Sequence, residues 1–171
     1  IGIEIYIQFF GNAFAQTATT FTSQNYGAGR IERLNKITVT ALVLCNTVTV
    51  TLSFLAFGMS NSLLRIFVTD AAVIALARTR MIYTLLFKPV QAVMDIMSGC
   101  LQGYGYTLVP AVISAFTVCG VRLLWVYTVF AHNRTLETLM FIYPITQGMA
   151  ALSHTICYIF LLRKIKRKAY E

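Results

Sequence analysis

The chain has 171 residues, of which 57% are hydrophobic and 12% charged, and its formal net charge is +8. A soluble domain of this size needs far more polar surface, so the composition favours a membrane protein over a soluble helical bundle. The cations cluster at the ends of apolar stretches, and no basic face carries aromatic side chains spaced to stack on bases, so we expect no nucleic-acid partner.

Five apolar stretches are about as long as a helix needs to cross a bilayer, which is about 20 residues. They lie at 3–22, 37–57, 81–102, 108–130 and 136–162. The links at 103–107 and 131–135 are short, which predicts antiparallel helical hairpins. We therefore predict an all-α membrane protein with about five transmembrane helices.

The distribution of cations predicts the orientation of these helices. With five crossings, the turn at Arg30, the turn at Tyr104 and the C-terminal tail share one side of the membrane. That side carries the cations of 30–36 and 163–168, whereas the other side carries the fewer cations of 65–80 and Arg134. Because Lys and Arg are enriched in cytoplasmic loops, we expect a cytoplasmic C-terminus.

The first stretch has a polar residue at every fourth position. On one face of the predicted helix lie Glu4, Gln8, Asn12 and Gln16. Amide side chains can also hold membrane helices together, so this face either packs against another helix or lines a cavity. Four residues in register favour a cavity lined by Gln8, Asn12 and Gln16. Glu4 lies near the outer end and is expected to be interfacial.

A glycine-containing turn follows, with the sequence Gln24-Asn25-Tyr26-Gly27-Ala28-Gly29. Gly27 and Gly29 allow the backbone to turn sharply where side chains would clash. A second turn, Gln102-Gly103-Tyr104-Gly105, repeats the Gln-x-Tyr-Gly pattern on the same side of the predicted bundle. This echo either reflects two related hairpins or is a coincidence.

The third stretch contains the group that is costliest in a membrane, the carboxylate of Asp95. One helical face there carries Lys88, Gln91, Asp95, Ser98 and Gln102. A cavity wall in which Asp95 binds a cation or a proton explains this stripe, and so does neutralisation of Asp95 by Lys88 through Gln91. We favour the cavity because intramembrane carboxylates usually serve a function.

Other polar and proline positions add to this picture. Gln147 in the last stretch is predicted to face the same cavity. Pro89 and Pro144 each remove a backbone hydrogen bond and predict a kink, and the kink at Pro89 coincides with the polar stripe. His154 is isolated on an apolar face and is expected to be a hydrogen-bonded packing residue.

Nothing in the sequence indicates an enzyme. There is no Gly-x-Ser-x-Gly, HExxH, P-loop or GxGxxG motif, and His132 and His154 have no clustered ligand partner. The four cysteines are widely spaced within apolar stretches, which predicts neither a zinc site nor a disulfide framework. We expect no catalytic residue, no metal centre and no cofactor.

Four strings of residues stand out in combination. They are Phe21-Thr22-Ser23-Gln24-Asn25-Tyr26-Gly27-Ala28-Gly29-Arg30, Phe67-Val68-Thr69-Asp70, Ser98-Gly99-Cys100-Leu101-Gln102-Gly103-Tyr104-Gly105-Tyr106-Thr107-Leu108-Val109-Pro110 and Cys119-Gly120-Val121-Arg122-Leu123-Leu124-Trp125. In this order the chain resembles the multidrug and toxic compound extrusion (MATE) family of cation-coupled exporters. The family has twelve helices in two lobes of six. The chain resembles helices eight to twelve, so residues 1–171 are expected to be a C-terminal lobe fragment without helix seven and the N-terminal lobe.

The resemblance implies a secondary active antiporter of the plasma (inner) membrane. Such a protein exports cationic or amphiphilic drugs and toxic compounds in exchange for Na+ or H+ by alternating access. Its partners would be membrane lipid, the small-molecule drug and the N-terminal lobe of the same chain. In sodium-coupled members an acidic residue on helix ten helps to bind the ion. Here that position holds Gln91, and the carboxylate lies one turn on, at Asp95.

We therefore predict that Asp95 is the coupling or drug-binding charge, with Na+ as one candidate ion. Lys88 and Gln91 would support it, and the cavity would be lined by Gln8, Asn12, Gln16 and Gln147. Two other functions fit the sequence. A flippase for lipid-linked oligosaccharides would need a more cationic cavity, for which Lys88 and Arg122 are the candidates. A non-transporting membrane scaffold would have polar stripes that pack together and stay dry.

Overall fold

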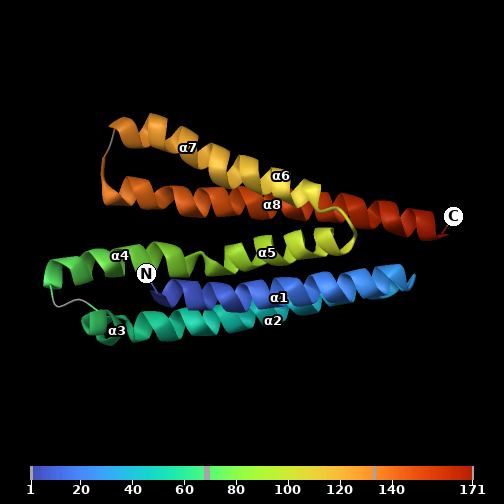
Figure 1. The fold of residues 1–171 in the computed structure, drawn as a ribbon, viewed down its shortest axis with the longest axis horizontal. Coiled ribbons are helices and arrows are strands. Elements are labelled where there is room, and N and C mark those ends of the chain that lie inside the picture. The colour runs from blue at the N-terminus through green and yellow to red at the C-terminus, as the bar shows by residue number, and fades with distance from the viewer. Residues whose placement is uncertain (1, 68–69, 133, 171) are drawn as a thin grey trace.

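The computed structural model describes residues 2–67, 70–132 and 134–170. Val68 and Thr69, which belong to one of the four strings above, lie outside these ranges. Within the described ranges the chain is almost entirely helical and has no strand. Figure 1 shows the helices running side by side along the longest axis of the molecule. The prediction of an all-α membrane protein is confirmed.

The helices follow the predicted apolar stretches with one exception. In chain order they are α1 (Gly2–Gly27), α2 (Ile31–Gly58), α3 (Ser60–Phe67), α4 (Ala71–Leu86), α5 (Lys88–Gly103), α6 (Leu108–Ser114), α7 (Val121–Trp125) and α8 (Leu136–Tyr170). A π-helical segment, η1 (Ala115–Gly120), joins α6 to α7, and a second, η2 (Val126–Phe130), continues α7, so that Leu108–Phe130 forms one rod. The exception is the stretch 81–102, which is divided between α4 and α5.

Three described helical stretches are long and apolar enough to cross a membrane. They are Ile31–Gly58, Leu108–Phe130 and Glu137–Arg167. α1 has sufficient length, but the polar row at Gln8, Asn12 and Gln16 lowers its hydropathy. α4 and α5 have 16 residues each, so only the pair together is as long as a bilayer requires.

The break between α4 and α5 lies at Phe87, two residues before Pro89. The backbone N–H groups of Val90 and Gln91 both donate to the carbonyl of Phe87, which makes this residue the start of a new helix. Pro89 stands in the first turn of α5, where the absence of its N–H costs no intrahelical bond. The predicted kink is therefore a full interruption, and it places Lys88 at the beginning of α5.

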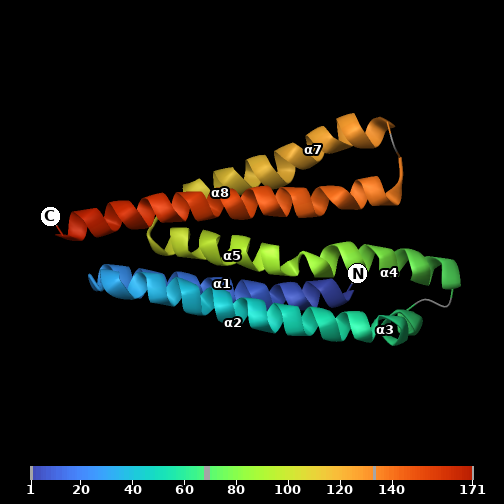
Figure 2. The same cartoon turned by 180° about the vertical axis from the view of Figure 1, so that it is seen from behind.

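The turn after α1, the turn after α5 and the C-terminus lie at the same end of the bundle (Figure 1), and the view from behind agrees (Figure 2). This arrangement is the one expected from the alternation of the apolar stretches. We call this end of the molecule the turn end.

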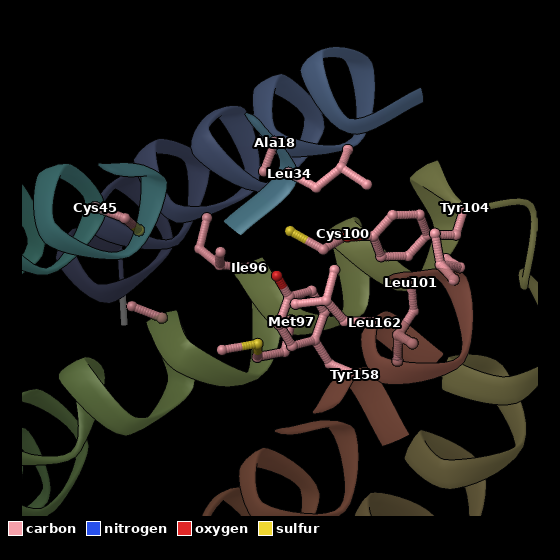
Figure 3. Close-up of a cluster of buried hydrophobic side chains, with 12 residues drawn as sticks. Ala18, Leu34, Cys45, Ile96, Met97, Cys100, Leu101, Tyr104, Tyr158 and Leu162 are labelled. Carbon is pink, nitrogen blue, oxygen red and sulfur yellow. The ribbon is translucent and has the colours of Figure 1, made fainter. Parts of the chain in front are cut away.

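The main hydrophobic core surrounds α5, which packs against α1, α2 and α8. Figure 3 shows side chains from all four helices in this core, among them Leu34, Ile96, Cys100 and Tyr158. A smaller cluster lies around α4 and contains Leu64, Met81 and Leu85 together with Ile7 and Ala56. α5 is therefore the element against which the other helices are positioned.

Two glycines allow α5 to approach α1 closely. A Cβ atom added at Gly99 would lie 2.6 Å from the backbone oxygen of Ala15, and one at Gly103 would lie 2.8 Å from that of Thr19. Such distances exclude any side chain, and glycines four residues apart are typical of close contacts between membrane helices. The hydroxyl of Thr19 donates to the backbone oxygen of Gly99 at 3.0 Å across this contact.

Both turns at the turn end close their helices in the same way. Gly29 has φ +69° and Gly105 has φ +88°, and each is followed by a residue whose N–H donates five residues back, Arg30 to Asn25 and Tyr106 to Leu101. This is the Schellman arrangement, which favours glycine. The corresponding glycines are thus Gly29 and Gly105, whereas the Gln-x-Tyr-Gly pattern aligned Gly27 with Gly105.

Candidate functional site

A chain of hydrogen bonds joins the polar rows of α1, α5 and α8. Gln8 is at its centre: its Oε1 accepts from the Nζ of Lys88 at 2.9 Å, and its Nε2 donates to the Oδ2 of Asp95 at 3.2 Å. Lys88 also donates to the Oε1 of Gln91 at 3.0 Å, which lies 3.4 Å from the Nε2 of Gln147. Three predicted spans therefore contribute to one polar network.

The network opens onto a groove between α1 and α5. This groove has a volume of about 210 Å³ and is lined by Asn12, Ala15, Gln16, Thr19, Asp95, Ser98, Gly99 and Gln102. Asn12 and Gln16 are exposed, and Asp95 is half-buried. The Asp95 carboxylate is the charged group of the groove, so a ligand that enters here meets one negative charge among neutral polar groups.

The structure brings together all seven residues predicted to line the cavity. Asp95 and Asn12 belong both to the network and to the groove, because Asn12 accepts from Gln8 at 3.2 Å. Gln16 lines the groove, whereas Lys88 is buried and its Nζ donates to the amides of Gln8 and Gln91. The predicted stripe of α5 is thus divided into a buried part and an open part.

Lys88 does not neutralise Asp95 by direct contact or through Gln91. Among the described residues Asp95 forms no ion pair, and its link to Lys88 passes through the Gln8 amide. Sequence reasoning missed this bridge because Gln8 lies 80 positions from Lys88 and 87 from Asp95 along the chain. The described residues also include no group of three or more His, Cys, Asp or Glu side chains that could hold a metal ion.

The carboxylate of Glu4 has partners on α4. Its Oε2 lies 3.3 Å from Arg80, and its Oε1 accepts from the hydroxyl of Thr84 at 2.9 Å. No sequence pattern indicated this pair, although both charges were expected near the same end of the bundle. The contact ties the start of α1 to the half of the broken helix that lies away from the turn end.

Arg122 is directed away from the groove. Its guanidinium lies 4.4 Å from the ring centroid of Tyr143, and its Nε donates to the hydroxyl of Thr146 at 3.3 Å. Both partners of Arg122 lie on α8. His154 is fully buried, and both of its ring nitrogens lie near backbone oxygens, those of Ala150 and Pro110.

The residues of the first turn lie outside the groove. Asn25 caps the end of α1 by donating from Nδ2 to the backbone oxygen of Phe21 at 2.9 Å, and Gln24 is exposed. Gly27 is the last residue of α1, and Gly29 forms the turn. At the same end the rings of Tyr26 and Tyr104 meet edge to face with centroids 5.4 Å apart.

Comparisons with known proteins identify the family. The MatE family model matches residues 1–128, which is 128 of the 171 residues. This range includes α1 and α5 and hence both walls of the groove. A search of the curated proteins finds no match. Members of the MatE family are membrane transporters rather than enzymes, and they work with a coupling ion and without a cofactor. The chain belongs to this family and is part of a multi-pass membrane transporter.

Proposed function

We propose that the chain belongs to a secondary active antiporter that exports cationic or amphiphilic compounds in exchange for Na+ or H+. The observation that carries the proposal is the position of Asp95. Its carboxylate lies in α5, within the stretch 81–102 that the sequence predicts to cross the membrane, forms no ion pair among the described residues and lines a groove. An intramembrane carboxylate without a direct countercharge is unfavourable unless a cation or proton occupies it for part of the transport cycle.

The groups around Asp95 suit a monovalent cation. Amide and carboxylate oxygens are hard ligands, and the groove offers the Asp95 carboxylate together with the amide of Asn12, whose Oδ1 accepts from the same Gln8 Nε2 that donates to Asp95. The Oε1 of Gln147 is buried and has no hydrogen-bond partner among the described residues, so the network ends in an unused acceptor. One negative charge matches one Na+, one H+ or the charge of a cationic drug.

The alternative functions receive less support from the geometry. A flippase for anionic lipid-linked sugars would use cations that face the cavity. Lys88 is instead buried between two amides, and Arg122 contacts Tyr143 and Thr146. A dry scaffold would bury both halves of the polar stripe, whereas Gln16 and Gln102 are exposed.

The proposed setting is the plasma (inner) membrane with the turn end and the C-terminus in the cytoplasm. The N-terminal lobe would face the groove and complete the cavity, so that rocking of the lobes exposes Asp95 to each side in turn. Residues 1–171 would supply the C-terminal lobe. The excess of Lys and Arg at the turn end supports this orientation.

The decisive experiment is export of a fluorescent cationic dye by the full-length protein with Asp95→Asn. We expect export to be lost while expression and membrane insertion are retained. Glu32→Gln is the matched control, because it removes the same charge from an exposed position in the first turn of α2. Normal dye export by Asp95→Asn would remove Asp95 from the mechanism.

Labelling with a membrane-impermeant thiol reagent separates a wet cavity from a dry scaffold. In a background without the four native cysteines, Gln16→Cys should react from the aqueous phase, and excess dye should slow the reaction. Ala18→Cys is the control, since this neighbouring position is fully buried in the core. Protection of both positions would favour the scaffold.

A further inference from the structure

A second, larger groove lies at the turn end, on the other side of α5. It has a volume of about 600 Å³ and is formed by α8, the end of α5 and the start of α6. Its lining residues are Leu101, Tyr106, Val109, Cys157, Phe160, Leu161, Arg163, Lys164 and Arg167. The volume is within the range of about 300–1,000 Å³ that is usual for small-molecule sites. The proposed transport site does not use any of these residues.

The groove changes character along α8. Cys157, Phe160 and Leu161 form its apolar part, and the cations Arg163 and Lys164 follow within one turn. A distance of seven residues, from 157 to 164, corresponds to about 10 Å along a helix. Figure 1 shows α8 continuing past the turn between α5 and α6 toward the C-terminus, so the cations lie nearer the membrane surface than the apolar wall. An occupant would therefore have an apolar tail directed inward and a charged group directed outward.

Two of the cations that line the groove, Arg163 and Lys164, have no countercharge among the described residues. Arg163 and Lys164 are exposed, and neither forms a hydrogen bond or an ion pair with another described residue. None of the lining residues is acidic. An anionic group would therefore be attracted to this end of the groove. Basic pockets between membrane helices on the cytoplasmic side are suited to anionic lipid head groups.

The aromatic side chains agree with a position at the membrane interface. Tyr106 follows the turn after α5 and is 41% exposed, and Phe160 is 67% exposed on the wall of the groove. Tyrosine is enriched where head groups begin, because its ring is apolar and its hydroxyl is polar. The groove thus has an apolar wall, then an interfacial tyrosine, then two cations. This order matches the acyl chain, the interfacial region and the phosphate of a phospholipid.

We propose that this groove binds one anionic phospholipid, with an acyl chain against Phe160 and Leu161 and the phosphate at Arg163 and Lys164. This site is independent of Asp95 and of the coupling ion. Its occupant would fix α8 against the α5–α6 turn at the membrane surface.

The test is lipid binding by the full-length detergent-solubilised protein, measured by native mass spectrometry during titration with phosphatidylglycerol and, separately, phosphatidylcholine. We expect the double variant R163Q/K164Q to bind phosphatidylglycerol roughly twentyfold more weakly, since each cation near an anionic head group changes the equilibrium constant about fivefold. The control R30Q/R33Q removes two cations from the other turn at the same end. We expect it to change binding by less than about twofold.

A third variant tests the apolar half of the groove. Phe160→Ala shortens an exposed side chain and keeps the cations, so the fold should be retained. It is expected to weaken phosphatidylglycerol binding about threefold or more, because apolar contact with the acyl chain is lost. Inorganic phosphate at millimolar concentration should not displace the lipid. Equal affinity for the two lipids, equal weakening in R30Q/R33Q, no effect of Phe160→Ala, or full displacement by phosphate would each overturn the proposal.

Discussion

Lys88 and Asp95 are joined through a side-chain amide rather than by a direct ion pair. The amide of Gln8 accepts from Lys88 at 2.9 Å and donates to Asp95 at 3.2 Å, so each charge is hydrogen-bonded while the carboxylate still faces the groove. A direct pair would neutralise the carboxylate and leave no reason for another cation to bind. The bridge thus stabilises both charges and keeps Asp95 available.

Removal of this bridge should affect stability as well as transport. Gln8→Ala deletes hydrogen bonds to two charged groups, and we expect a loss of about 2–4 kcal/mol in the free energy of unfolding. Gln16→Ala, two turns along the same helix, removes an exposed amide and should cost less than about 0.5 kcal/mol. Thermal unfolding of the two variants in detergent measures the difference. Equal melting temperatures would show that the Gln8 amide does not stabilise the charges.

The glycine contact between α1 and α5 should be intolerant of any added side chain. Gly99→Ala places a Cβ 2.6 Å from the Ala15 backbone oxygen, and the helices must separate to relieve this contact. We expect a destabilisation of about 1–3 kcal/mol and reduced dye export, because the groove walls move apart. Gly148→Ala on α8 is the control, since nothing lies within 4 Å of its Cβ position. The free energy of unfolding of that variant should be unchanged or higher by up to about 1 kcal/mol, because alanine has the higher helix propensity.

The buried hydroxyl of Tyr158 should contribute to the packing of α8 on α2. It donates to the hydroxyl of Thr38 at 2.9 Å, and Thr38 is 3.3 Å from the sulfur of Cys100. Tyr158→Phe is expected to cost about 1–3 kcal/mol, since the hydroxyl of Thr38 loses a buried donor. Tyr127→Phe provides the comparison, because Tyr127 is 78% exposed. In urea unfolding of both variants, only Tyr158→Phe should have a lower free energy of unfolding than the unmodified protein.

The two glycines of the first turn should differ in their tolerance of alanine. Gly29 has φ +69°, a conformation that costs an L-residue about 1–2 kcal/mol, whereas Gly27 is the last residue of α1. Gly29→Ala should therefore lower the melting temperature, and Gly27→Ala should leave it unchanged or raise it. The same loss in both variants would contradict the assignment of the turn to Gly29.

The sequence predicted the helical stretches well because apolar length and polar periodicity are local properties of the chain. Of the residues expected in the cavity, Asn12, Gln16 and Asp95 line the groove, and they share helical faces with their polar neighbours, which is why their periodicity pointed to them. The sequence could not predict that Gln8 lies between Lys88 and Asp95. That contact depends on how far α1 is displaced along α5, and the displacement is determined by backbone contact at Gly99.

The division at Phe87 was predicted only as a kink. Pro89 indicates that a hydrogen bond is missing, but whether a helix bends or stops there depends on the packing of neighbouring helices. Arg122 illustrates the same limit. The sequence offered it as a cation for a flippase cavity, whereas its guanidinium lies over the ring of Tyr143, which is on another helix.

The interruption at Phe87 divides one membrane crossing into two segments with separate attachments. α5 is fixed to α1 by a contact between glycine and backbone, whereas α4 is connected to α1 through the side chains of Glu4, Arg80 and Thr84. Side-chain contacts can exchange partners without unwinding either helix. A movement of α4 relative to α5 would therefore exchange side-chain contacts rather than backbone contacts, and Lys88, the first residue of α5, would be the charge of the network nearest to it.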